Sequence, residues 1–129
     1  MTDDSGKILV VEDNAFVRMQ IVKFISEETG FEVVEAEDGQ DALDKDISGM
    51  VMMFVDVRME PMGGFEFVRN LSSEDIRVPF VIITGDKSAD ILHQADKEGA
   101  AAVLMKPIEK DRLVMMVKRI AARRKRSDL

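Results

Sequence analysis

The chain of 129 residues is 46% hydrophobic and 33% charged, which supplies enough apolar material for the core of one globular domain and excludes a disordered chain. Its apolar runs are too short to span a bilayer and its first residues lack the apolar stretch of an export signal, so we expect a cytoplasmic protein without membrane contact. The absence of cysteine excludes thiol catalysis, thiolate metal sites and disulfides.

Charge is distributed unevenly along the chain. Residues 1–117 hold 12 Lys and Arg against 24 Asp and Glu, a net charge of −12. An acidic body repels the phosphates of nucleic acid, so we expect no direct binding of DNA or RNA. We interpret the basic end as a solvated helix end, favoured by the helix dipole, in preference to a phosphate-binding segment. Its basic residues are Lys118, Arg119, Arg123, Arg124, Lys125 and Arg126.

The chain opens with a short apolar run that predicts a buried strand over residues 7–11. A helical pattern follows, and Asp13 or Asn14 is placed to accept hydrogen bonds from its first free N–H groups. The apolar residues of this segment recur at helical spacing, and Gly30 is the expected end of the helix. The first unit is therefore a strand joined to a helix by an acidic turn.

A second strand and a shorter helix come next. Residues 31–36 alternate more strongly between apolar and polar side chains, which is typical of an edge strand. Asp38 and Gly39 begin a short helix that turns Ile47 inward, and Gly49 is expected to close it.

The most apolar stretch lies at the centre of the chain. Residues 50–55 form a continuous apolar run whose length suits a strand buried on both faces, and Asp56 stands at its C-terminal end. A glycine-containing loop separates this strand from a third helix, marked by Phe67, Val68 and Leu71. A carboxylate at the end of a buried strand is more often functional than a product of packing.

The last part of the chain repeats the same alternation. Residues 79–84 form another apolar strand, a helix covers about 88–98 with Gly99 at its end, and a short strand covers 101–105. A final helix follows. Its apolar face consists of Leu113, Met116, Val117 and Ile120.

Five strands alternating with five helices predict an α/β fold. Each connection is long enough for a right-handed crossover, so the sheet is expected to be parallel and doubly wound. We predict the flavodoxin-like strand order 2-1-3-4-5. The whole of 1–129 is expected to be one domain, with a core over about 6–122 and a basic tail over 123–129.

Reactive side chains follow four of these strands: Glu12 and Asp13, Asp56, Thr84 and Lys106. In this strand order the first and third strands are neighbours at the switch point, so the side chains are expected to share one crevice. Each residue alone has an ordinary alternative role, as a helix cap, a strand-end residue or a solvated charge. The coincidence at four strand ends favours a common site.

Electrostatics limits what such a crevice can do. Two carboxylates ~4 Å apart repel by about 4 kcal/mol at an effective dielectric constant of ~20, so three of them require a cation or a raised pKa. Lys106 supplies one positive charge, and Mg²⁺ with oxygen ligands is the expected second cation. Asp56 is then the natural nucleophile, because a carboxylate can form an acyl phosphate.

Four short motifs carry a family resemblance that covers essentially the whole chain. They are VVEDN at 10–14, M-x-P-M-x-G after Asp56, ITG at 83–85, and Lys106-Pro107. Together they resemble the receiver domain of two-component response regulators, similar to the chemotaxis-type receiver. The resemblance implies a phosphorylation-dependent switch rather than an enzyme with an external substrate, since such a domain catalyses only its own phosphorylation and dephosphorylation.

The same resemblance assigns roles to the strand-end residues. Asp56 accepts a phosphoryl group from a sensor histidine kinase or a phosphotransfer protein, and Thr84 and Lys106 read that group. The Lys106-Pro107 peptide bond is often cis in the family.

The resemblance also implies a Mg²⁺ site. Asp13, Asp56 and the main-chain carbonyl of Arg58 bind the ion, and Glu12 assists through water.

Two positions depart from the family pattern. The proline that usually stands four residues after the phosphoacceptor is replaced by Glu60, and Pro61 follows it. The position three residues before Lys106, commonly an aromatic residue that acts as a rotamer switch, is Val103. Val103 therefore weakens the argument for an output mechanism in which an aromatic ring turns inward.

Three alternatives remain open. A Mg²⁺-dependent aspartyl-phosphate phosphatase shares the strand-end Asp, but the dehalogenase-like enzymes carry a second Asp where this chain has Arg58. A flavodoxin-like electron carrier shares the fold class, but the chain lacks both the phosphate loop after the first strand and any Trp or Tyr. A receiver-like module that binds partners without phosphorylation is compatible with every motif.

Two further expectations concern the surroundings of the site. Arg58 and Asp86 each lie two residues after a site residue, and we expect them to pair over the phosphoryl group and to slow the approach of water. His93 is expected on the exposed face of the fourth helix, away from the chemistry.

Output is expected from the domain's own surface, because no effector segment is recognisable after the final helix. Phosphorylation would act on the segment before the fourth helix and on the last strand. We therefore expect the face made by the fourth helix, the last strand and the final helix to bind a downstream protein partner or to form a homodimer.

Overall fold

Five parallel strands form one sheet in the order β2-β1-β3-β4-β5, which confirms the predicted fold class and strand order. The computed structural model describes residues 6–86 and 88–127, without the side chains of 125–127. The strands are β1 (Lys7–Val11), β2 (Glu32–Ala36), β3 (Met52–Asp56), β4 (Phe80–Thr84) and β5 (Ala102–Met105). The helices are α1 (Ala15–Glu28), α2 (Gly39–Leu43), α3 (Gly64–Ser73), α4 (Ala89–Lys97) and α5 (Lys110–Ser127).

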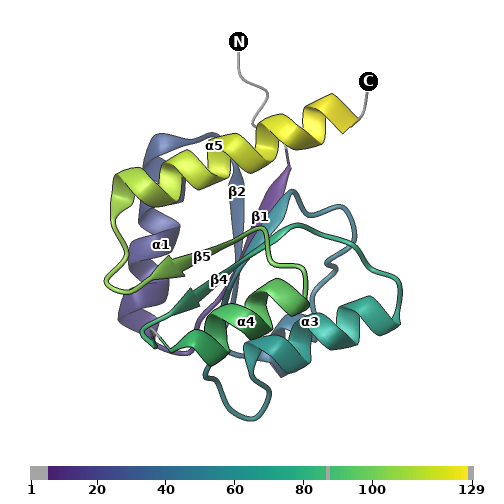
Figure 1. The fold of residues 1–129 in the computed structure, drawn as a ribbon. Helices are drawn as coiled ribbons and strands as arrows, with labels where there is room; N and C mark the ends of the chain where they lie inside the picture. The colour runs from purple at the N-terminus through teal and green to yellow at the C-terminus, as the bar shows by residue number, and fades with distance from the viewer. Residues whose placement is uncertain (1–5, 87, 128–129) are drawn as a thin grey trace.

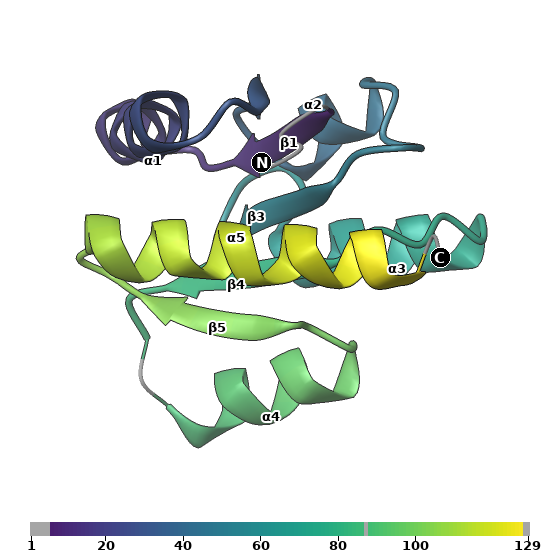
Figure 2. The same ribbon diagram turned by 90° about the horizontal axis from the view of Figure 1, so that it is seen from above.

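Helices cover both faces of the sheet. Figure 1 shows α5 on one side of the strands and α3 and α4 on the other. The view from above in Figure 2 places α1 and α4 at opposite sides of the molecule, with β1, β3, β4 and β5 following one another between them. The chain is thus a three-layer sandwich in which the sheet is the middle layer.

Alternation along the strands produces two separate apolar clusters. In β1, Ile8 and Val10 pack in the cluster that α1 and α5 cover, whereas Leu9 and Val11 pack in the cluster that α2, α3 and α4 cover. Every residue of β3 and β4 is buried, which explains why these strands are continuous apolar runs. The partly exposed β2 is the edge strand that its alternating sequence predicted.

Several helix ends differ from the sequence prediction. Helix α1 ends at Glu28, before Gly30, because the backbone of Thr29 is extended (φ −138°, ψ 167°), and the N–H and hydroxyl of Thr29 both donate to the carbonyl oxygen of Ile25, at 2.9 and 2.7 Å. Helix α2 ends at Leu43, although Ile47 in the following loop is buried as expected. Helix α5 continues to Ser127, so the part of the predicted tail 123–129 that the structure describes is helical. Residues 128–129 lie outside the described residues.

A close approach joins α3 to the end of β3. The N–H of Gly64 donates to the carbonyl oxygen of Val57 at 3.0 Å, and a Cβ at Gly64 would collide with the main-chain oxygen of Asp56. Glycine is therefore required at this position by space.

None of the described helices combines the length and the apolar composition that a membrane span requires.

Candidate functional site

The carboxyl ends of β1, β3, β4 and β5 surround one pocket of about 420 Å³. The strand-end residues predicted from the sequence all line it, so the structure brings together the side chains that the sequence places at separate strand ends. The lining residues are Glu12, Asp13, Asn14, Asp56, Arg58, Thr84, Gly85, Asp86 and Lys106.

Strand pairing explains this convergence. Val11 of β1 pairs with Val55 of β3, Asp56 pairs with Ile83 of β4, and Thr84 pairs with Met105 of β5. The residues that follow or end these strands therefore stand at one edge of the sheet. At the first strand, Asn14 caps α1 by accepting hydrogen bonds from two main-chain N–H groups at 3.0 Å each, which fixes the turn that carries Glu12 and Asp13.

Lys106 joins the two most buried carboxylates. Its Nζ lies 3.1 Å from Oε2 of Glu12 and 3.4 Å from Oδ1 of Asp56. Glu12 is fully buried and Asp56 is 5% exposed, so both carboxylates have lost most of their water. Asp56 also accepts a hydrogen bond from the N–H of Val57 at 2.9 Å. One ammonium thus serves two carboxylates, which leaves the pocket with an excess of negative charge.

The pKa values reflect this imbalance. Burial, and next the charge of Asp56, raise the pKa of Glu12 to about 7, against the opposing effect of the Asn14 N–H and of Lys106. Burial also raises the pKa of Asp56 above its ordinary value, although Lys106 counteracts the change. Burial by itself lowers the pKa of Lys106, but the two carboxylates together raise it, so the ammonium stays charged.

Three carboxylates are placed so that they could hold a metal ion. Glu12, Asp13 and Asp56 each present an oxygen atom, and these atoms lie within 4.8 Å of one another. Oε2 of Glu12 is buried and, among the residues that the structure describes, it accepts no hydrogen bond. The donor set consists of oxygens, and Oε2 of Glu12 is ion-paired with Lys106 at 3.1 Å without accepting a hydrogen bond from any described residue, so the set fits a hard divalent cation such as Mg²⁺.

Thr84 contributes a hydroxyl to the wall of the pocket. The residue is 3% exposed, and its Oγ1 accepts a hydrogen bond from the N–H of Asp86 at 3.0 Å. Since Oγ1 acts as the acceptor in that bond, its own O–H remains a donor for a ligand in the pocket.

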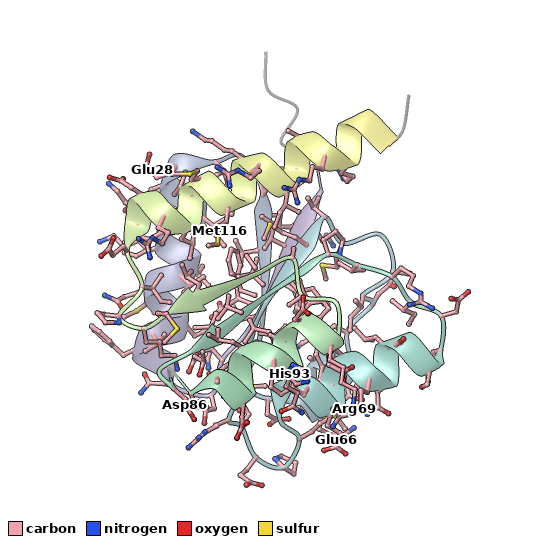
Figure 3. The ribbon with its side chains drawn as sticks, in the orientation of Figure 1. Glu28, Glu66, Arg69, Asp86, His93 and Met116 are labelled. Atoms are coloured by element: carbon pink, nitrogen blue, oxygen red, sulfur yellow. The ribbon has the colours of Figure 1, made fainter. Side chains whose placement is uncertain are left out.

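Arg58 and Asp86 form an ion pair at the rim of the pocket, as the sequence predicted. The Nη2 of Arg58 donates to Oδ2 of Asp86, and the Arg58 side chain is 75% exposed. The pKa of Asp86 is lowered, first by the N–H of Ser88, which donates to Oδ1 at 2.8 Å, and also by Arg58. Figure 3 places Asp86 before the N-terminal end of α4, so the pair links the loop after β3 to the segment that leads into α4.

Three other expectations concern residues around the pocket. The single histidine, His93, is exposed on α4, as Figure 3 shows, and does not line the pocket. Val103 is partly buried in β5 and packs against the cluster on the α4 side of the sheet. The Lys106-Pro107 peptide bond is cis, as the resemblance implied, and so is the Glu60-Pro61 bond in the loop that departs from the family pattern.

Sequence reasoning missed one residue beside the pocket. The Nη1 of Arg18 donates to the main-chain oxygen of Glu12 at 2.7 Å, and its Nε donates to Oε1 of Glu35 at 3.2 Å. The available signal is its position on α1, one residue after the inward-facing Val17 and three residues before the buried Ile21. An arginine next to an apolar stripe can place its stem inside and its head at the edge of the core.

Comparison with known proteins identifies the family. The sequence model of the response regulator receiver domain matches residues 8–118. The chain is 30% identical over 119 residues to the transcriptional regulatory protein PdtaR of Mycobacterium tuberculosis, covering 91% of this chain and 57% of that protein. It is 33% identical over 114 residues to the transcriptional regulatory protein FixJ of Bradyrhizobium diazoefficiens, covering 87% of this chain and 55% of that protein. The chain thus spans about half the length of these relatives.

The fold has a close structural counterpart. The crystal structure of a CheY-like response regulator receiver domain protein from Methanospirillum hungatei superposes with a TM-score of 0.85. That likeness covers 95% of this chain and 98% of the other at 21% sequence identity, and at this identity it supports the fold alone.

Proposed function

Because the chain belongs to the response regulator receiver domain family of two-component systems, we propose that it is a phosphorylation-dependent switch with Asp56 as the phosphoacceptor. Receiver domains are signalling domains that take phosphoryl groups from histidine kinases and act on downstream effectors. The observation that carries the assignment is the pocket itself, where a buried Asp56 lies 3.4 Å from the ammonium of Lys106 and shares the lining with Thr84.

The residues of the pocket can divide the work of phosphoryl transfer. An oxygen of the Asp56 carboxylate attacks the phosphorus of a phosphohistidine, the P–N bond breaks, and the imidazole nitrogen keeps the bonding electron pair. Lys106 stabilises the negative charge of the transferred oxygens, and the hydroxyl of Thr84 donates a hydrogen bond to one of them. Water later attacks the phosphorus of the acyl phosphate, the bond between phosphorus and the Asp56 oxygen breaks, and inorganic phosphate leaves, which restores the carboxylate.

Receiver domains bind Mg²⁺ at an acidic pocket, and the residues of this chain fit such an ion. We assign Asp13, Asp56 and the main-chain carbonyl of Arg58 as its ligands, with Glu12 acting through water. When bound, the ion supplies the positive charge that phosphoryl oxygens require. The carboxyl groups of Glu12, Asp13 and Asp56 supply the oxygens that would attract such a cation.

The phosphodonor is proposed to be a sensor histidine kinase or a phosphotransfer protein that docks on α1. Phe16 and Met19, which are 63% and 59% exposed, lie on the first turns of this helix. They follow Asn14, which lines the pocket. Exposed large apolar side chains beside a reactive crevice are suited to hold a protein donor there.

The output surface is proposed to consist of α4, β5 and α5, which would bind a downstream protein or a second copy of the chain. A phosphoryl group on Asp56 would attract Thr84 at the end of β4 and Lys106 at the end of β5. Both residues precede segments that lead directly into α4 and α5. Because Val103 has no ring to turn inward, the segment around Gly85 and Asp86 is expected to carry most of the movement.

Substitution of the phosphoacceptor tests the proposal. Asp56→Asn is expected to abolish the Mg²⁺-dependent gain of one phosphoryl group from a small phosphodonor, measured by mass spectrometry of the intact protein. Asp96→Asn, at an exposed position on α4, is the matched control and should be phosphorylated like the wild type. An Asp56→Asn protein that still gains the group at the wild-type level would refute the assignment. A folded wild-type protein that gains none would favour a receiver-like module that binds partners without phosphorylation.

A further inference from the structure

Arg18 holds the main chain at the point where β1 turns into the acidic edge of the pocket. Its Nη1 donates to the carbonyl oxygen of Glu12 at 2.7 Å, a short bond for a charged donor. Its side chain is 15% exposed, so this is a largely buried cation. We propose that Arg18 is a positioning residue for the metal-binding edge, and this inference rests on the function proposed above.

The carbonyl group of Glu12 needs this donor because of where it lies in the chain. The N–H of Glu12 still belongs to the sheet and donates to the oxygen of Ala36 at 3.1 Å. The ladder of α1 begins two residues later, where the N–H of Arg18 donates to the oxygen of Asn14 at 2.9 Å. The Glu12 oxygen thus falls between the strand and the helix, and the guanidinium supplies the bond that neither element provides.

This bond acts on the carboxylates through the backbone. Glu12 and Asp13 are consecutive, so the carbonyl group of Glu12 belongs to the peptide unit that links them, and fixing its orientation restricts ψ of Glu12 and φ of Asp13 and thereby the path of the turn that carries both side chains. The Asn14 N–H donates to Oε1 of Glu12 at 3.2 Å, and that contact also depends on the path of this turn. By fixing the carbonyl oxygen, Arg18 keeps the oxygens of Glu12 and Asp13 within reach of Asp56.

Glu35 orients the guanidinium from the neighbouring strand. Its Oε1 accepts from Nε of Arg18 at 3.2 Å, but its side chain is 51% exposed. An exposed ion pair contributes little by itself, so the bond to the carbonyl oxygen is the important one. The two contacts can therefore be separated by substitution.

Mg²⁺ titration of four variants tests the inference by calorimetry, with no phosphodonor present. Arg18→Met keeps the apolar stem and removes every donor, and it is expected to weaken Mg²⁺ binding by about tenfold, as loss of a residue that orients metal ligands generally does. Arg18→Lys keeps one donor for the carbonyl oxygen and should recover part of that loss. Glu35→Gln should bind Mg²⁺ almost like the wild type. Arg69→Met is the control for loss of a partly exposed arginine, since Arg69 pairs with Glu98 on the other side of the sheet.

A second readout needs no metal. Amide hydrogen exchange of Glu12 and Asn14 should be faster in Arg18→Met, while exchange of Ile83 in the core of β4 stays unchanged. Unchanged Mg²⁺ affinity in Arg18→Met, or unchanged exchange at both amides, would overturn the inference. A wild-type protein that binds no Mg²⁺ would refute the proposed ion site instead, and the exchange data would still decide whether Arg18 holds the turn.

Discussion

Glu12 has a carboxyl group whose ionisation opposes folding. Its pKa is raised from an ordinary 4.5 to about 7 in the folded protein, chiefly by burial. Between these two values the folded protein holds a proton that the unfolded chain has released. Unfolding in this window therefore releases a proton, so the free energy of unfolding falls as pH rises from 4.5 to about 7.

Glu12→Gln is expected to remove much of this pH dependence, because a neutral amide cannot be ionised. Above pH 7 the variant should be more stable than the metal-free wild type by about 1–3 kcal/mol, the scale set by a pKa change of this size. Urea denaturation followed by circular dichroism in the presence of a chelator measures the difference. Parallel pH profiles for the two proteins would contradict the explanation.

Arg58 lies at the rim of the pocket, where we propose that water would approach an acyl phosphate on Asp56. Arg58→Ala removes the ion pair with Asp86 from the rim of the pocket and is expected to speed dephosphorylation by about three- to tenfold, a change in barrier of about 1 kcal/mol. Decay of the phosphorylated protein after removal of the donor gives the rate. Arg77→Ala is a matched control, since Arg77 is equally exposed and pairs with Asp75 in a loop outside this pocket. An unchanged or slower rate for Arg58→Ala would show that the pair does not shield the group.

Single residues of the site also show which structural roles can be predicted from the sequence. Asp56, Thr84 and Lys106 could be placed in one pocket because each directly follows or ends an apolar run, and parallel strands bring such ends together. Arg18 could not be assigned a role in this way. Its partner is a main-chain oxygen, which no side-chain pattern reveals, and Glu35 reaches it only through the pairing of β1 with β2.

At the scale of helices and strands, boundaries were predicted best where packing and hydrogen bonding coincide. Strand β1 matches its prediction at both ends, and α4 lies within the predicted range with Gly99 at positive φ just after it. The short α2 was predicted too long, because Ile47 is buried from a loop and therefore mimics the spacing of a helix. Burial alone does not distinguish these two conformations.

Among the residues that the structure describes, the exposed large apolar side chains form one pair on α1 and a second pair divided between α4 and α5. Phe16 and Met19 lie on α1, whereas Leu92 lies on α4 and Met115 on α5, and they are 46–63% exposed. This separation suggests that donor binding and output binding use different surfaces. A single exposed apolar side chain is common in proteins. Here a pair lies at each proposed surface, so the effects of substituting the two pairs can be compared directly.

Phe16→Ala with Met19→Ala should slow phosphoryl transfer from a protein donor by about tenfold, because about 1.4 kcal/mol of docking energy is lost. Transfer from a small phosphodonor should be unchanged, since the pocket is intact. Leu92→Ala with Met115→Ala is the matched control and should leave both rates as in the wild type. Equal loss with the two kinds of donor would mean that the α1 substitutions damage the pocket.

The reactive groups of the pocket lie at one end of the sheet, and the segments that lead into α4 and α5 begin at the same end. Val103 stands where the family commonly has an aromatic ring, so we expect the segment after Thr84 and the helices α4 and α5 to respond directly. A bound group shifts such an equilibrium only by its differential affinity, typically about 1–3 kcal/mol. The response should therefore be a change of protection rather than a large rearrangement.

Hydrogen exchange with and without beryllofluoride, which mimics the phosphoryl group, is expected to change across residues 85–120. The Asp56→Asn protein treated in the same way is the control for effects of the reagent. Changes confined to α1 and α2, with residues 85–120 silent, would mean that the signal leaves by the opposite side of the molecule.

The close approach of Gly64 to the main-chain oxygen of Asp56 leaves no space for a side chain behind the proposed phosphoacceptor. The backbone that bears the carboxylate rests against the first turn of α3, and a side chain as small as a methyl group does not fit between them. If Asp56 is phosphorylated as proposed, we therefore expect little movement of β3 toward α3. The displacement would then fall on the residues that face the pocket, so we expect the proposed switch to respond on that side of β3 alone.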